Sequence, residues 1–186
     1  MKNSDYKLIS SNRVYNGKKV KVLDETIQLP NGNIVEWDMV EYPDIYMAIP
    51  VTNRKTVLMV QQWRQGPKVI MTDFVGARLD NPKEEGLEAL KREVREELGI
   101  IGGNHNLHVK YSNGVRISGK RHIYLITDFE QAEQNLEKNE LVNIVELPAI
   151  GLYKELSENH VVTADTLLMA KLVEEMMLET KLTKRE

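Results

Sequence analysis

The clearest hydrophobic pattern in the chain lies between residues 86 and 100, in the segment GLEALKREVREELGI. Its apolar residues recur at spacings of three, four and four positions, which places on one side of a helix the residues Leu87, Leu90, Val94 and Leu98. Gly99 follows them, and glycine commonly ends a helix because it adopts the left-handed backbone conformation without strain. The pattern therefore predicts one amphipathic helix that ends near this glycine.

Apolar runs before and after this helix predict strands. The runs YMAIPV and TVLMVQQWR, within residues 46–64, are continuous, which is typical of strands buried on both faces. Residues 30–33 separate two β-prone runs, and the Asn-Gly pair within them favours a tight hairpin. LHVKYS, RHIYLITDF and VNIVELP predict further strands, and helices are expected over residues 150–159 and from about 163 to 182.

This order of elements predicts an α+β fold in which helices cover both sides of a sheet, an α/β/α sandwich. We expect residues 1–45 to form a small N-terminal β-hairpin subdomain, and residues 46–186 to form the main domain. An isolated two-stranded hairpin is marginally stable in water, so the subdomain is expected to pack on something else.

The polar side of the predicted helix carries three carboxylates at positions i, i+3 and i+4, namely Glu93, Glu96 and Glu97. Each like-charge pair at this spacing costs roughly 0.2–0.5 kcal/mol, and the dipole at the helix end adds to that cost. A divalent cation that prefers oxygen ligands, such as Mg2+ or Mn2+, would remove both penalties. A surface helix held by ion pairs is the alternative, and we expect Arg92 to pair with Glu88 and Glu96.

Composition narrows the possible function classes. Hydrophobic residues make up 41% of the chain and charged residues 28%, which is ordinary for a globular protein. The net charge of −3 gives no reason to expect nucleic acid or a membrane as partner. Cysteine is absent, which excludes disulfides and thiol nucleophiles. No apolar run approaches the ~20 residues of a membrane span, so we expect a cytoplasmic protein.

Residues 84–100 resemble the Nudix box, the sequence pattern of a family of pyrophosphohydrolases. Seven residues separate Glu84 from the run REVREELGI, which fits the family pattern R-E-apolar-x-E-E-x-G-apolar at every position. The start of the box departs from the pattern, because the box glycine would fall on Arg78. Residues 73–80, DFVGARLD, are similar to the E-L-P-A-G-R-I-D lead-in of ADP-ribose pyrophosphatases, and on that pairing Ala77 stands for the glycine.

The resemblance implies the Nudix fold, an α/β/α sandwich with a mixed sheet. It also implies metal-dependent hydrolysis of a nucleoside diphosphate sugar, most simply ADP-ribose to AMP and ribose 5-phosphate. The implied cofactor is Mg2+, with Mn2+ as the other possibility, and the implied ligands are Glu93, Glu96, Glu97 and a backbone carbonyl near Gly76 or Ala77. The same glutamates would be catalytic, and a late acidic loop would add a general base, either Glu137 or Glu140.

Substrate contacts are implied for four further residues, Arg64, Asp73, Trp37 and Ser112. Arg64 ends a segment like the Q-x-R of ADP-ribose pyrophosphatases, and its planar fork suits a diphosphate. Trp37 offers an aromatic face to a base, although sheet packing is the plainer role. The strand that holds Trp37 lacks the arginine usual in that branch, which keeps GDP-mannose as an alternative substrate.

The resemblance also bears on the oligomeric state and on whether the protein is an enzyme or a sensor. In the resembling pyrophosphatases the N-terminal sheet packs across a two-fold axis, so the resemblance implies a homodimer. A nucleotide-sensing Nudix-like domain without catalysis is a second alternative, and it would predict damaged box carboxylates or an added DNA-binding unit. All three box carboxylates are present, which favours the enzyme.

Overall fold

The computed structural model describes residues 2–79 and 83–182, and it divides the chain into two compact units. Unit 1 consists of Met1–Asp44 and Lys110–Arg121, and unit 2 consists of Ile45–Val109 and His122–Glu186. Unit 1 thus includes a segment, Lys110–Arg121, that the sequence assigned to the main domain. The predicted box helix and the acidic loop both belong to unit 2.

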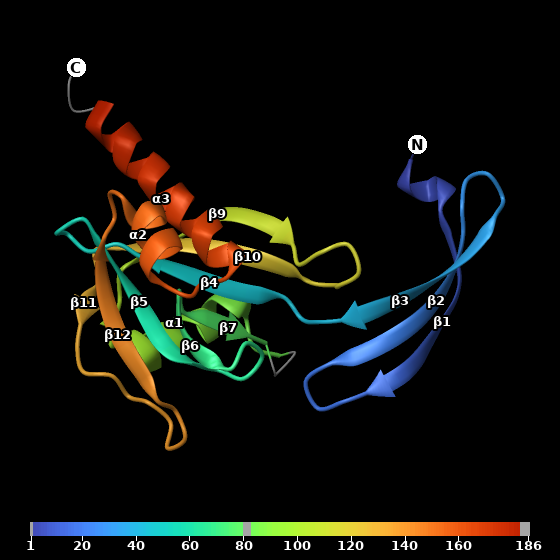
Figure 1. Ribbon diagram of the computed structural model, residues 1–186, viewed down its shortest axis with the longest axis horizontal. Helices are drawn as coiled ribbons and strands as arrows, with labels where there is room; N and C mark the ends of the chain where they lie inside the picture. Colours follow the sequence, from blue (N-terminus) through green and yellow to red (C-terminus); the bar gives the residue numbers. More distant parts are fainter. Residues whose placement is uncertain (1, 80–82, 183–186) are drawn as a thin grey trace. The chain divides into compact units, whose positions relative to one another are not determined.

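Unit 1 is built on a three-stranded antiparallel sheet in the order β1-β2-β3. After a short 3-10 helix at Asn3–Asp5, its strands are β1 (Lys7–Asn16), β2 (Lys21–Gln28) and β3 (Ile34–Glu41) (Figure 1). The predicted hairpin at residues 30–33 is confirmed, since it joins β2 to β3 with Gly32 at φ 86°. The N-terminal sheet contains more than this hairpin, because β1 pairs along β2 as a third strand.

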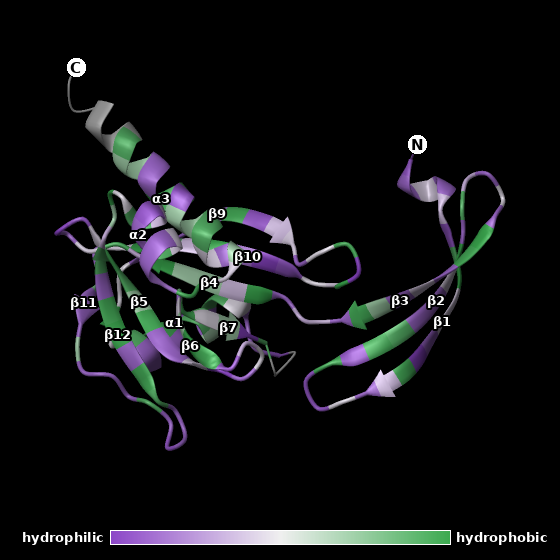
Figure 2. Ribbon diagram, viewed as in Figure 1, coloured by the Kyte–Doolittle hydropathy of each residue, from purple (hydrophilic) through white to green (hydrophobic). Residues whose placement is uncertain are grey.

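The sheet of unit 1 has no buried core of its own. Among residues 2–44 and 110–121 every side chain keeps some exposure to solvent. Several large apolar side chains on the three strands are exposed, among them Leu8, Ile9, Val14, Tyr15, Ile34 and Trp37. Figure 2 shows hydrophobic and hydrophilic stretches side by side along these strands.

The remaining strands and the three α-helices of the described residues lie wholly or mainly in unit 2. Its strands are β4 (Ile45–Pro50), β5 (Thr56–Arg64), β6 (Val69–Asp73), β7 (Gly76–Arg78), β8 (Ile100–Ile101), β9 (Asn104–Ser112), β10 (Lys120–Thr127), β11 (Glu130–Gln131) and β12 (Val142–Pro148). They form sheets in the orders β7-β4-β10-β9, β12-β5-β6 and β11-β8. The two continuous apolar runs therefore become β4 and β5 of different sheets.

The helices are α1 (Gly86–Leu98), α2 (Leu152–Asn159) and α3 (Ala164–Leu182). The predicted end of the box helix is confirmed, because Gly99 is left-handed at φ 69° and ψ 18° and its N–H bonds back to the helix. At the other end Gly86 lies against the Tyr46 ring, where an added Cβ would come within 1.9 Å of a ring carbon. The first turn of α1 is thus seated closely on β4.

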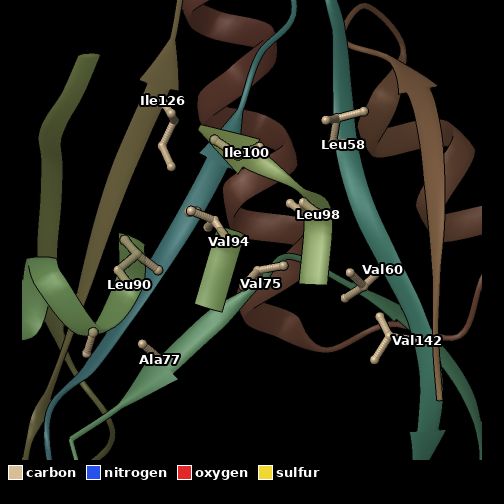
Figure 3. Close-up of a cluster of buried hydrophobic side chains, with 12 residues drawn as sticks. Leu58, Val60, Val75, Ala77, Leu90, Val94, Leu98, Ile100, Ile126 and Val142 are labelled. Carbon is tan, nitrogen blue, oxygen red and sulfur yellow. The ribbon is translucent and has the colours of Figure 1, made fainter. Parts of the chain in front are cut away.

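The strands of unit 2 lie between α1 on one side and the C-terminal helices on the other. Figure 3 shows Leu90, Val94 and Leu98 of α1 facing the strands, with C-terminal helices behind them. Along β5 the alternating residues Leu58 and Val60 belong to the buried hydrophobic cluster that Figure 3 draws, and Met59 between them is equally buried. Burial on both faces confirms the expected α+β sandwich. No helix in the described part of the chain could cross a membrane.

Candidate active site

The apolar stripe of α1 determines where its glutamates lie. Since Leu90, Val94 and Leu98 are buried against the strands, the glutamates of the other side stay partly exposed. Nη1 of Arg92 contacts Oε1 of Glu93 and Oε2 of Glu96, each at 2.9 Å. Its Nε lies 3.6 Å from Oε1 of Glu84, the first box glutamate.

Arg92 thus organises the box carboxylates, but only partly as expected. The pair with Glu96 is confirmed, whereas the expected pair with Glu88 is wrong. Glu88 instead accepts a 2.7 Å hydrogen bond from Lys91, which lies one turn along on its own side of the helix. The arginine turns toward Glu84 and Glu93, both of which the box pattern contains.

Glu97 lies outside this arginine network and is the most perturbed acid of the site. Burial, together with the nearby charges of Glu93 and Glu140, raises its pKa to about 7. Burial also raises the pKa of Glu93, against the opposing effect of Arg92. The protein therefore holds at least two carboxyls where negative charge is poorly compensated, the situation that a bound cation would relieve.

Arg64 and Asp73 lie on the antiparallel strands β5 and β6, where Arg64 is opposite Val69 and its side chain reaches Asp73 farther along the pair. Nη2 of Arg64 lies 3.6 Å from Oδ2 of Asp73, and the arginine side chain keeps 40% of its surface exposed. The other carboxylate oxygen of Asp73 accepts hydrogen bonds from the Thr166 hydroxyl at 2.6 Å and the Phe74 N–H at 2.9 Å. Burial raises the pKa of Asp73, and its charge in turn raises that of Glu97. The two substrate candidates thus lie in the electrostatic field of the box.

Gly76 and Ala77 form the start of β7, which pairs antiparallel with β4. Ala77 is fully buried opposite Tyr46, whereas Gly76 is exposed opposite Met47. Their place on a strand adjacent to α1 is compatible with a carbonyl directed at the box. Asp80, which ends the compared lead-in, lies outside the described residues.

The acidic loop distinguishes its two candidate bases. Glu137 is exposed, whereas Glu140 is partly buried and its charge acts on both Glu93 and Glu97. Oε2 of Glu140 accepts a 2.9 Å hydrogen bond from the N–H of Glu137, and the N–H of Glu140 donates to the Glu137 carbonyl at 3.0 Å. The loop is thus held by its own hydrogen bonds, and Glu140 is the loop residue whose charge acts on the box glutamates.

Trp37 and Ser112 belong to unit 1, and the other candidates belong to unit 2. Trp37 lies on β3 with 40% of its surface exposed. The Ser112 hydroxyl donates to the Gly114 carbonyl at 3.1 Å within the loop that follows β9. Their roles toward a substrate stay predictions.

The oxygen atoms available at the box are of the kind that binds a hard divalent cation. They are carboxylates and carbonyls, and the two raised pKa values show uncompensated negative charge. Within residues 2–79 and 83–182 no three acidic, histidine or cysteine side chains are already arranged to hold an ion. Arg92 draws Glu93 and Glu96 toward itself, so binding would require rotation of these side chains.

The sequence did not predict one set of contacts at the site, the hydrogen bonds between residues 131–135 and the end of α1. Residues 131–135 follow α1 by more than thirty positions, yet they donate hydrogen bonds to the last carbonyls of that helix. Polar residues in this segment were the only available signal, and they are equally typical of a solvated loop.

Comparison with known proteins agrees with this geometry. A family model described as the NUDIX domain matches residues 42–166. A methanol dehydrogenase activator of Bacillus methanolicus is 22% identical over 87% of this chain and 89% of its own. An ADP-ribose pyrophosphatase of Bacillus subtilis strain 168 is 24% identical over 89% of this chain and 91% of its own.

A solved structure agrees in fold. A crystal structure of an ADP compounds hydrolase covers 94% of this chain, and the chain covers 95% of it, with a TM-score of 0.78 and 19% identity. The family match spans every box residue from Glu84 to Gly99, together with Arg64, Asp73 and the acidic loop. The chain therefore belongs to the NUDIX family and is a Nudix pyrophosphohydrolase.

Proposed function

We propose that the protein hydrolyses the diphosphate linkage of a nucleoside diphosphate sugar, ADP-ribose to AMP and ribose 5-phosphate, with Mg2+ or Mn2+ as cofactor. The observation that carries this proposal is the electrostatic coupling of Glu97 with Glu93 and Glu140 beside the half-exposed Arg64. The names of two similar proteins, ADP-ribose pyrophosphatase and ADP compounds hydrolase, support ADP-ribose as the first substrate to test.

In this proposal the cation is held by Glu93, Glu96 and Glu97, with a backbone carbonyl at Gly76 or Ala77. When bound, a divalent cation supplies positive charge against the diphosphate oxygens and makes water a stronger acid. The raised pKa values of Glu93 and Glu97 support this assignment, because both carboxyls would gain from a neighbouring positive charge.

The residues around the box then divide the work of hydrolysis. Arg64 binds a diphosphate oxygen pair with its planar fork, and Asp73 orients that fork. Glu140 takes the proton of the attacking water, whose oxygen bonds to phosphorus as the bridging P–O bond breaks. Glu140 is preferred to Glu137 because it is the less exposed of the two and acts on Glu97. Without a cation Arg92 pairs with Glu93 and Glu96, whose side chains would rotate toward a bound ion.

We also propose that the N-terminal unit makes the protein a homodimer, with Trp37 and Ser112 serving the substrate. The support is the set of exposed apolar side chains on a sheet without a buried core, since such surfaces commonly mark interfaces. Light scattering of the full chain tests this directly. A monomer with normal activity would contradict it.

The substrate is tested by phosphate release from ADP-ribose, GDP-mannose, UDP-glucose and dinucleoside polyphosphates, with Mg2+ or Mn2+ and a coupled phosphatase. Glu97→Gln should abolish turnover, and Glu88→Gln, on the same helix but paired with Lys91, should not. Preference for GDP-mannose would replace ADP-ribose as substrate. Binding of nucleotide without turnover would favour a sensor. Turnover that depends on another enzyme would favour an activator role like that named for the Bacillus methanolicus relative.

A further inference from the structure

Four successive carbonyls at the end of α1 accept hydrogen bonds from one short segment. The Glu96 carbonyl accepts from the N–H of Asn135 at 2.9 Å, and the Gly99 carbonyl accepts from the N–H of Ala132 at 2.9 Å. Between them, side-chain amides of residues 134 and 131 donate to the Glu97 carbonyl at 2.5 Å and the Leu98 carbonyl at 3.4 Å.

These carbonyls would otherwise have no partner within the helix. The last four carbonyls of any α-helix lack an internal donor and are usually satisfied by water or a capping residue. Here two of them belong to Glu96 and Glu97, so the donors hold the backbone of the turn that carries the box carboxylates. The donors also offset the negative end of the helix dipole at the place where these carboxylates add to it.

Gln134 makes a second contact that distinguishes it from the other donors. Its Nε2 also lies 3.3 Å from the carbonyl oxygen of Val142, the first residue of β12. A single amide therefore joins the last turn of α1 to both ends of the acidic loop, residues 135–141. Leu136 at the start of this loop packs against the buried cluster, and Gln134 itself is partly buried. The Gln134 amide and the Leu136 side chain therefore anchor the loop, and the residues between Leu136 and Val142 are ordered by contacts within the loop.

We propose that Gln134 is a positioning residue for the hydrolytic reaction. Its amide closes the base of the acidic loop against α1 and so holds the loop that carries Glu140 beside the last turn of the helix. This inference rests on the proposed role of Glu140 as the base. Gln131, which reaches one α1 carbonyl and no part of β12, has no such role.

Hydrogen–deuterium exchange of the full chain without metal tests the anchoring. Gln134→Met keeps the length of the side chain and removes its donors, and Gln131→Met is the matched control. We expect the amides of Glu137 and Glu140 to exchange about tenfold faster in the first variant, and within about twofold of wild type in the second. If Gln134→Met does not fold, Gln134→Asn gives the same comparison, because its shorter amide cannot span both carbonyls. Unchanged exchange would overturn the proposal.

A double-mutant cycle on kcat tests the link to Glu140. Gln134→Met should lower kcat about 10- to 100-fold, since small displacements of reacting groups have effects of this size, and leave KM within about threefold. In a Glu140→Gln background, Gln134→Met should lower kcat by less than about twofold relative to Glu140→Gln alone. Losses that multiply in full would show a merely structural role and overturn the proposal. Full activity of Glu140→Gln would remove Glu140 as base and overturn it as well, while hydrolysis in the same assay would leave the proposed substrate chemistry standing.

Discussion

Glu97 allows a prediction in which stability and activity move in opposite directions. Its carboxyl is held partly buried beside Glu93 and Glu140, and its pKa rises from the ordinary 4.5 to about 7. Replacing it by glutamine keeps the shape and removes the charge. In protein free of metal, we therefore expect Glu97→Gln to raise the free energy of unfolding at high pH.

The sign and the pH range follow from proton linkage. Between pH 4.5 and 7 the folded wild type binds a proton that the unfolded chain has released, so its stability falls as pH rises. Below that range the carboxyl is neutral in both states and the substitution should have little effect. Each pKa unit is worth about 1.36 kcal/mol, which gives roughly 3 kcal/mol above pH 7. Because the side chain keeps partial contact with solvent, we expect about 2 kcal/mol.

Thermal unfolding in EDTA measures this effect at pH 4.5 and pH 8.5. A gain of about 2 kcal/mol corresponds to a rise in Tm of about 4–8 °C for a chain of this size. Glu88→Gln is the matched control, an exposed glutamate on the same helix, and should change stability by less than about 0.5 kcal/mol. With saturating Mg2+ the wild type should gain stability and the Glu97 variant should gain little. A lower Tm of Glu97→Gln at pH 8.5, or an equal gain at both pH values, would refute the reasoning.

Three further predictions concern the cofactor, the substrate clamp and the seating of α1. EDTA should abolish hydrolysis and Mg2+ or Mn2+ restore it, so full activity in EDTA would remove the metal from the proposal. Arg64→Ala should weaken substrate binding by about 1.5–3 kcal/mol, measured as a rise in KM. Arg64→Lys should restore only part of that binding, because a point charge cannot replace the planar fork of arginine. Gly86→Ala should lower the free energy of unfolding by about 1–3 kcal/mol, since the new methyl meets the Tyr46 ring, and denaturant melts measure it. Gly66→Ala, with no atom within 4 Å of its added Cβ, is the control, and an equal loss there would contradict the steric account.

The sequence alone determined the features that depend on neighbours along the chain. The spacing of Leu90, Val94 and Leu98 specified which side of α1 is buried, and Gly99 specified where the helix ends. Both follow from backbone geometry within a few turns. The same periodicity put Glu93, Glu96 and Glu97 together on the other side, which is why the box could be recognised before the fold was known.

The tertiary structure alone decided which charged groups act on one another across the chain. Arg92 pairs with Glu96 on its own helix as expected, but it contacts Glu84 and Glu93 in place of Glu88. The high pKa of Glu97 also depends on burial, which local spacing does not specify.

The acidic loop and the N-terminal sheet also depend on contacts that the local sequence does not specify. Glu137 and Glu140 look equivalent in sequence, and in the fold Glu140 is the less exposed of the two and its charge acts on Glu97. Gln134 meets Glu97 from 37 positions away, and β1 joins the N-terminal sheet by pairing along its whole length. Contacts of this kind form only when distant segments close on a common core. Periodicity along the chain reports which face of an element is buried, and it carries no information about what that face or its opposite will meet.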